Sequence, residues 1–224
     1  LTLLALTVVG STAFAQTNSV LSRNAVGYVR VEVEKGKLAL VRHDFEDITG
    51  RGLAITNVIG DQLPQDSAIL LWDYSLQTYI GANKTRSGWG AGGTNRLLRG
   101  QSFFIRVPPT APSNSYVVYL MGEVPDKNTA PTSSVAVVNG IGMYGLPYPV
   151  AEKFTNTTLA KQAKQDDSVL VWNYASQTYQ GDNKTRSGWG AFAQSLELTP
   201  GQGFWFRTSA AGSNWMVGKP YTWP

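Results

Sequence analysis

The chain contains a long internal repeat, and no other feature of the sequence constrains its fold as strongly. Residues 65–91 and 165–191 share 18 identities in 27 positions, and nine of these are consecutive, in the string Asn-Lys-Thr-Arg-Ser-Gly-Trp-Gly-Ala. After one inserted residue the register resumes, where 100–106 (GQSFFIR) aligns with 201–207 (GQGFWFR). The sequence therefore predicts two related units in tandem.

The same repeat indicates where the chain divides. A fainter likeness between 29–36 and 133–140 extends the two units toward their N-terminal ends. Between the units, residues 125–131 (PDKNTAP) are polar and carry two prolines, which is typical of a short linker. We therefore predict a first half, residues 16–126, and a second half, residues 127–224.

The apolar residues of each half alternate with a period of two, and this alternation indicates strands. Residues 69–74 (ILLWDY) are rich in β-formers and precede the turn-prone Ser75-Leu76-Gln77, so a hairpin with 78–80 is expected. A further strand pair is expected between 101–107 and 116–121, joined by the Pro-rich loop PPTAPSNS.

Helices are expected to be short. Only 47–63 and 151–165 have a composition compatible with a turn or two of helix. With six to eight strands expected in each half, the predicted fold class is all-β. The predicted architecture is two tandem small antiparallel β-sandwich or barrel domains related by internal duplication.

The N-terminal residues predict export. An apolar run over 1–9 is followed by small residues that end in Ala13-Phe14-Ala15 before Gln16, and this pattern predicts a secretory signal peptide over 1–15. The run is shorter than the roughly 20 residues that cross a bilayer, so no membrane span is expected. Because the chain has no Cys, neither a disulfide framework nor a lipid-accepting Cys is available. The predicted location is secreted or at the cell surface.

The order of four short motifs in each half supports this interpretation. These are Trp-x-Tyr, Gln-Thr-Tyr, Gly-Trp and Gly-Gln-x-Phe, the last of them within Pro200-Gly201-Gln202-Gly203-Phe204-Trp205. This order resembles the β-sandwich repeats of exported proteins from Bacteroidetes, Verrucomicrobia and Planctomycetes. The first half departs from the pattern, with Arg99 and Ser102 in place of the Pro and the second Gly. The resemblance implies an uncharacterised secreted or cell-surface module and transfers no catalytic residue.

The inventory of reactive side chains argues against an enzyme. His43 is the single His and Cys is absent, which excludes sites built from several His ligands and Cys nucleophiles. A Ser-His-Asp triad would need His43, and the chain has no Gly-x-Ser-x-Gly elbow to present a nucleophile. His43 is instead expected in a loop after a strand over 38–41. We predict no catalytic residue.

The acids and glycines give no further site. Asp66 matches Asp166 in the repeat, but Asp73 becomes Asn173 and Asp182 matches an Ala, so neither half keeps a fixed carboxylate pair for glycoside hydrolysis. Asp66 and Asp166 are expected in turns ahead of a strand. No calcium loop or phosphate-binding loop is present. No metal site and no cofactor is predicted.

The net charge does not indicate a nucleic-acid partner. The chain carries a formal charge of +4 and has a pI near 9.3, but its Lys and Arg are scattered and form no basic run. Weak attraction to an anionic cell surface is the most that this charge supports.

The duplicated string is the candidate ligand site. Trp and Tyr could stack on the apolar faces of sugar rings, while Asn, Lys and Arg bond hydroxyl or carboxylate groups. The candidate residues in the two halves are Tyr79, Asn83, Lys84, Arg86 and Trp89, and Tyr179, Asn183, Lys184, Arg186 and Trp189. In the alternative interpretation the two Trp are core residues and Arg86 pairs with Asp73 or bonds backbone carbonyls. Trp72, Trp172 and Tyr74 are expected in the core.

Three functions follow from these observations. The first is a non-enzymatic binding module for a polysaccharide or another cell-surface polymer, in which two sites in tandem would gain avidity. The second is a self-associating subunit of a surface layer or fibre, in which the segment 16–25 could add to a neighbour's sheet. The third, a glycan-active enzyme, is the least favoured.

Overall fold

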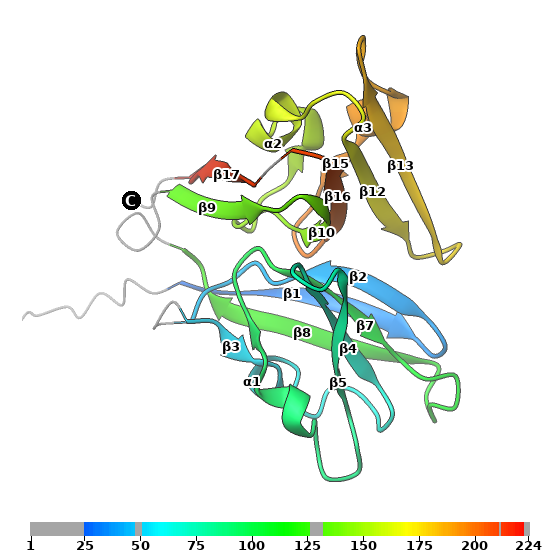
Figure 1. Cartoon of the computed structure of the whole chain (residues 1–224). Coiled ribbons are helices and arrows are strands. Elements are labelled where there is room, and N and C mark those ends of the chain that lie inside the picture. The colour runs from blue at the N-terminus through cyan, green and yellow to red at the C-terminus, as the bar shows by residue number, and fades with distance from the viewer. Residues whose placement is uncertain (1–24, 48–50, 126–131, 211, 222–224) are drawn as a thin grey trace, which may run out of the picture.

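The computed structural model describes residues 25–47, 51–125, 132–210 and 212–221 (Figure 1). The predicted signal peptide, nearly all of the segment 16–25 and most of the predicted linker lie outside the described residues. Within them, strands pair antiparallel and helices are short, so the chain is mostly β, as predicted. No helix in the described part is both long and apolar enough to cross a membrane.

The first half forms a four-stranded antiparallel sheet in the order β2-β7-β4-β5. Its strands are β2 (Leu38–Arg42), β7 (Ser102–Arg106), β4 (Ala68–Asp73) and β5 (Thr78–Asn83). β4 and β5 are the predicted hairpin, with Trp72 opposite Tyr79. Gln77 lies in its turn at a φ of 50°.

The second half forms a sheet in the order β10-β16-β12-β13-β14. Its strands are β10 (Gly140–Tyr144), β16 (Phe204–Thr208), β12 (Ser168–Asn173), β13 (Thr178–Thr185) and β14 (Gly188–Trp189). In its hairpin Trp172 lies opposite Tyr179, the register of the first half, and Gln177 has a φ of 53°.

Each half also has a two-stranded ribbon. β1 (Val26–Glu34) pairs with β8 (Ser115–Glu123), and β9 (Thr132–Val137) pairs with β17 (Ser213–Gly218). The prediction that 101–107 pairs with 116–121 is wrong. β7 already has β2 and β4 on its two edges, so the Pro-rich loop carries the chain away from this sheet to the ribbon.

Short elements connect the sheets and ribbons. β3 (Leu53–Ala54) pairs with β6 (Arg96–Leu97), and β11 (Glu152–Lys153) pairs with β15 (Glu197–Leu198). The helices are α1 (Ile55–Val58), α2 (Thr158–Gln162) and α3 (Ala191–Ser195), and the 3-10 turns are η1 (Ala91–Thr94) and η2 (Phe154–Asn156). α1 and α2 lie inside the two ranges predicted to be helical. Thr157 caps α2 by accepting a hydrogen bond from the N–H of Ala160 at 3.1 Å.

Each half buries a core between its sheet and its ribbon. In the first half Phe103 and Ile105 of β7 join Val118 and Leu120 of β8 in one buried cluster, and in the second half Phe204 and Phe206 of β16 join Trp215 of β17. Because successive side chains of a strand point to opposite faces, Phe104 points out of its own core. It joins the third cluster, between the halves.

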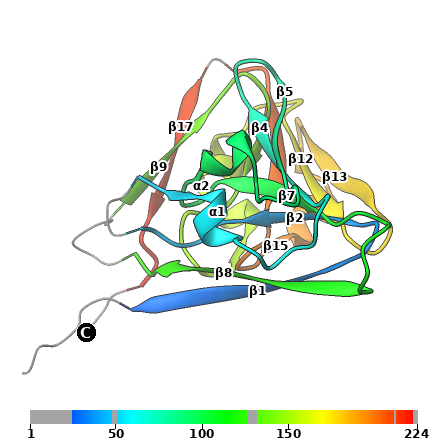
Figure 2. The same ribbon diagram turned by 90° about the horizontal axis from the view of Figure 1, so that it is seen from below.

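The halves are stacked one above the other in Figure 1, and Figure 2 shows the first half from below. The third cluster holds Leu40 and Phe104 from the first half with Met143 and Trp205 from the second, all buried. We call the contact around this cluster the seam.

Candidate functional site

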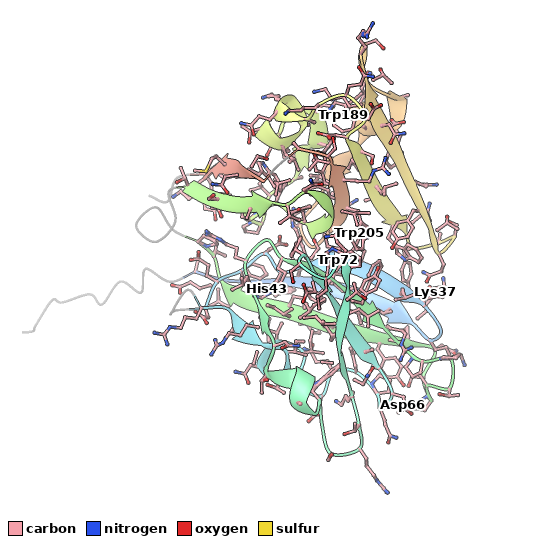
Figure 3. All side chains as sticks on the ribbon, viewed as in Figure 1. Lys37, His43, Asp66, Trp72, Trp189 and Trp205 are labelled. Carbon is pink, nitrogen blue, oxygen red and sulfur yellow. The ribbon has the colours of Figure 1, made fainter. Side chains whose placement is uncertain are left out.

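The two Trp of the duplicated string are core residues, so the prediction that they stack on sugars is corrected. Trp89 is 4% exposed and Trp189 9% exposed, and Figure 3 shows Trp189 inside the second half, far from the seam. The indole N–H of Trp89 donates to the carbonyl of Gly60 at 2.7 Å, and that of Trp189 donates to the carbonyl of Ala160 at 3.1 Å. Each ring is therefore held by the helical segment of its own half.

Lys84 and Lys184, the equivalent Lys residues of the two strings, also bond the helical segment of their own half. Lys84 Nζ donates to the carbonyl of Gly60 at 3.2 Å and to Asp61 Oδ1 at 2.8 Å. Lys184 Nζ donates to the carbonyls of Ala160 and Ala163 at 3.2 and 2.6 Å. Each ammonium group also lies 5.8–5.9 Å from the centroid of the neighbouring Trp ring. Lys and Trp together satisfy carbonyls that the short helices leave without an internal partner.

The polar residues of the string lie on the surface. Asn83, Arg86, Asn183 and Arg186 are exposed on or beside the outer strands of the two sheets. Asp73 does not reach Arg86 and instead accepts hydrogen bonds from Ser75 and Leu76 in its own turn. With the Trp rings buried, these polar residues have no aromatic partner from the string beside them.

Tyr79 and Tyr179 belong to the seam. They are 41% and 46% exposed, and their rings pack edge-on against Trp72 and Trp172 respectively and against Trp205. Partial burial and a hydrogen bond to Tyr179 raise the pKa of Tyr79. Figure 3 shows Trp72 and Trp205 together where the halves meet. The ten predicted site residues thus occupy three separate places and form no single site.

The seam is held by contacts that each half makes to the other. The indole N–H of Trp72 donates to the carbonyl of Ile141 at 2.8 Å, and that of Trp172 donates to the carbonyl of Leu38 at 2.9 Å. Gln77 Oε1 accepts the N–H of Ile141 at 2.9 Å. Gln177 Oε1 accepts the N–H of Leu38 at 2.8 Å. The Trp and the turn Gln of each hairpin therefore form hydrogen bonds with the edge strand of the other half. We call these hydrogen bonds the hairpin contacts.

A buried polar cluster completes the seam on one side. Arg42 and Asp44 are both 0% exposed and form an ion pair. Arg42 Nη2 donates to the carbonyls of Tyr148 and Val150 at 3.3 and 3.2 Å. Asp44 Oδ2 accepts the N–H of Gly201 at 2.6 Å. Burial raises the pKa of Asp44 to about 6, although Arg42 and the Gly201 N–H act in the opposite direction.

His43 lies between these two residues and directly follows β2, as predicted. It is 1% exposed, and neither ring nitrogen has a hydrogen-bond partner among the described residues. Burial lowers its pKa to about 4, so the ring is neutral at pH 7. Asp66 and Asp166 have φ values of 65° and 71° and lie in turns ahead of β4 and β12, also as predicted. No group of three or more His, Asp or Glu in the described part could hold a metal ion.

An exposed apolar surface that was not predicted from the sequence lies on the outer side of the ribbon β1–β8. Val26 is 76% exposed, Tyr28 67%, Met121 52% and Tyr119 40%. The register places Tyr28 opposite Met121 and Arg30 opposite Tyr119, so these side chains share one face. We call Val26, Tyr28, Tyr119 and Met121 the outer face. The alternation in the printed β1 sequence held this signal, because Tyr28 is out of phase with the buried Val33.

The two exposed rings adjoin each other. The centroids of Tyr28 and Tyr119 are 5.8 Å apart and their planes meet at 66°, so the rings form a corner. Arg30 and Glu32 lie on the same face, joined by a 3.0 Å ion pair. The corresponding face of β9 and β17 presents Met216 but no aromatic ring.

The hollows of the surface are open and shallow by comparison with an enclosed site. One, of about 410 Å³, lies between η2, the start of α2 and β17, and another of about 300 Å³ lies at the other end of α2. Comparison with protein-family models, curated proteins and solved structures gave no match.

Proposed function

We propose that the chain is an exported, non-catalytic binding protein that holds carbohydrate against the outer face of the β1–β8 ribbon. The observation that carries this proposal is the pair of adjacent exposed rings, Tyr28 and Tyr119, on the outer face of the two-stranded ribbon. Aromatic rings offer sugars a large apolar contact at low conformational cost. The neighbouring Arg30 and Glu32 supply a donor and an acceptor for hydroxyl groups.

We also propose that the two halves are copies of one β-sandwich unit produced by duplication. The matched hairpin registers and the paired positive φ at Gln77 and Gln177 support this origin. In this proposal the duplicated string is a repeated structural device of the unit, and the ligand surface belongs to the first half alone.

The test is retention of the chain from Gln16 onward on a panel of insoluble and cell-wall polysaccharides. We expect at least one polymer to retain the protein, and the double variant Tyr28→Ser/Tyr119→Ser to bind it about 10-fold more weakly or worse, because both stacking contacts are lost. Both rings are exposed, so the thermal melting midpoint should change little.

Two control variants separate this surface from the rest of the chain. Met216→Ser changes an exposed apolar residue, 47% exposed, on the corresponding ribbon of the second half and should leave retention unchanged. Trp89→Phe keeps an aromatic ring in the core and should also retain the polymer. Loss of retention in Met216→Ser, or full retention in the double Tyr variant, would refute the proposed surface.

A further inference from the structure

β1 is an edge strand. Among the described residues it pairs with β8 alone, and Figure 2 shows it at the margin of the molecule. Its free backbone groups can be assigned from β8. The N–H and C=O of Tyr119 both bond the Gln62 side chain, at 2.7 and 3.4 Å, and therefore point away from β1.

This assignment fixes the direction of the β1 groups. Tyr119 lies opposite Arg30, so that pair is of the non-hydrogen-bonded kind. The N–H and C=O of Arg30, and those of Tyr28 and Glu32 by alternation, therefore point to the open edge. The N–H of Glu34 confirms the alternation, because it donates outward to the Tyr174 hydroxyl at 2.7 Å.

The side chains along this edge carry charges of opposite sign two residues apart. Arg30 and Glu32 have side chains 50% and 46% exposed and form an ion pair within the strand. When two copies of such a strand run antiparallel with Val31 opposite Val31, Arg30 of each copy lies opposite Glu32 of the other. The four charges then alternate in sign across the junction.

We propose that β1 pairs with β1 of a second copy of this chain, antiparallel and with Val31 on the twofold axis. The outward N–H and C=O groups of Arg30 and Glu32 then bond those of the other copy, and a four-stranded sheet with the strand order β8-β1-β1-β8 results. Opposite charges placed directly across antiparallel strands stabilise the pair, and like charges oppose it.

The charges also select this register over its neighbour. A shift that places Arg30 opposite Arg30 brings like charges together, so the alternating arrangement is favoured. The contact uses the same strand on both partners, and such a contact closes a dimer and does not propagate into a fibre. The corresponding strand β9 has the sequence TSSVAV and carries no charge that could select a partner.

The test uses the full chain and a charge exchange. The wild type should show a concentration-dependent dimer by sedimentation velocity. Arg30→Glu and Glu32→Arg should each raise the dimer dissociation constant by about 10-fold or more, because each places like charges opposite one another at two positions. An equimolar mixture of the two variants should regain the dimer, and so should the double variant Arg30→Glu/Glu32→Arg. Ser134→Glu in β9 should leave the dimer intact.

Two results would overturn the proposal. One is a wild type that stays monomeric at every concentration up to about 1 mM. The other is a set of single-charge variants that dimerise as well as the wild type or do not respond to mixing. The inference stands apart from carbohydrate binding, because the double variant Tyr28→Ser/Tyr119→Ser keeps Arg30 and Glu32 and should still form the dimer.

Discussion

The two halves of the chain make equivalent hairpin contacts to each other, but they differ at the centre of the seam. Trp72 and Trp172 make equivalent hydrogen bonds across it. Leu38 and Ile141 both lie opposite an Arg in the neighbouring strand, Arg106 and Arg207, and four residues further on Arg42 corresponds to Gly145.

At this central position one half has a large side chain, Arg42, and the other has none. A Cβ on Gly145 would lie 2.6 Å from Arg42 Cδ and 2.8 Å from Arg42 Cβ. Ser102 and Gly203, matched in the repeat, behave alike, since a Cβ on Gly203 would lie 2.6 Å from Ser102 Oγ. Two equivalent positions that face each other across an axis cannot both hold a large side chain. The halves can therefore have the same residues at the hairpin contacts but must have different residues at the axis.

The strongest way to break this asymmetry is to remove the acid that supports the central Arg. Asp44→Ala leaves Arg42 buried without its carboxylate and should lower the free energy of unfolding by about 3–5 kcal/mol, measured by urea denaturation. Asp61→Ala is the matched control, because it removes an acid paired with Lys84 at a fully exposed position. That variant should lose far less, because an ion pair whose acid is exposed to solvent contributes little to stability. Equal losses in both variants would contradict the structural role given to the buried pair.

The pH dependence of stability sharpens the comparison, because His43 has no counterpart of its kind in the second half. Its folded pKa is about 4, below the ordinary 6.5, so the unfolded chain binds more protons between these values. Its contribution is complete above pH 6.5 and is lost as the pH falls to 4, by up to about 3 kcal/mol.

Asp44 opposes this trend, since its folded pKa of about 6 lies above the ordinary 3.8 and stability rises as the pH falls through that window. The difference in unfolding free energy between wild type and His43→Leu isolates the His contribution. We expect the variant to gain on the wild type as the pH falls from 6.5 to 4. A difference that stays constant over this range would show that His43 does not titrate as its burial implies.

The smallest expected effect comes from Gly145, the residue without a side chain that faces Arg42. Gly145→Ala introduces a methyl group against Arg42 and should cost about 1–3 kcal/mol through overpacking. Gly218→Ala, in β17, meets no atom within 4 Å and should stay within about 0.5 kcal/mol of the wild type. Chemical denaturation of both variants gives the comparison, and a neutral Gly145→Ala would mean that the seam can yield at its centre.

Much of the local structure could be predicted from the sequence. The apolar run 69–74 and its turn gave the β4–β5 hairpin because strand period and turn chemistry are local properties. The partner of β7 could not be predicted in this way, since pairing depends on which edges other strands have already taken. The alternation of Phe103 and Phe104 shows two faces, but not that the second face meets the other half of the chain.

The candidate site was harder to predict for a related reason. A Trp among glycines has the same sequence whether it lies in the core or on the surface. Both rings are buried here by apolar clusters and by the carbonyls of Gly60 and Ala160, all of which include residues distant in the sequence. A repeated string is as compatible with a structural role as with a role in binding a ligand. Tyr28 occurs in one half only, so the repeat gives no indication of it.

The hairpin contacts across the seam have a consequence during synthesis of the chain. The partner of the Trp72 indole N–H is the carbonyl of a residue 69 positions later, which a ribosome adding 5–20 residues per second reaches after roughly 3 to 14 seconds. Until then Phe104 and the β4–β5 hairpin of the first half lack their partners in the second half. A nascent chain in this state offers a chaperone an apolar surface to hold, and that surface is covered only when Trp205 of β16 has also been made.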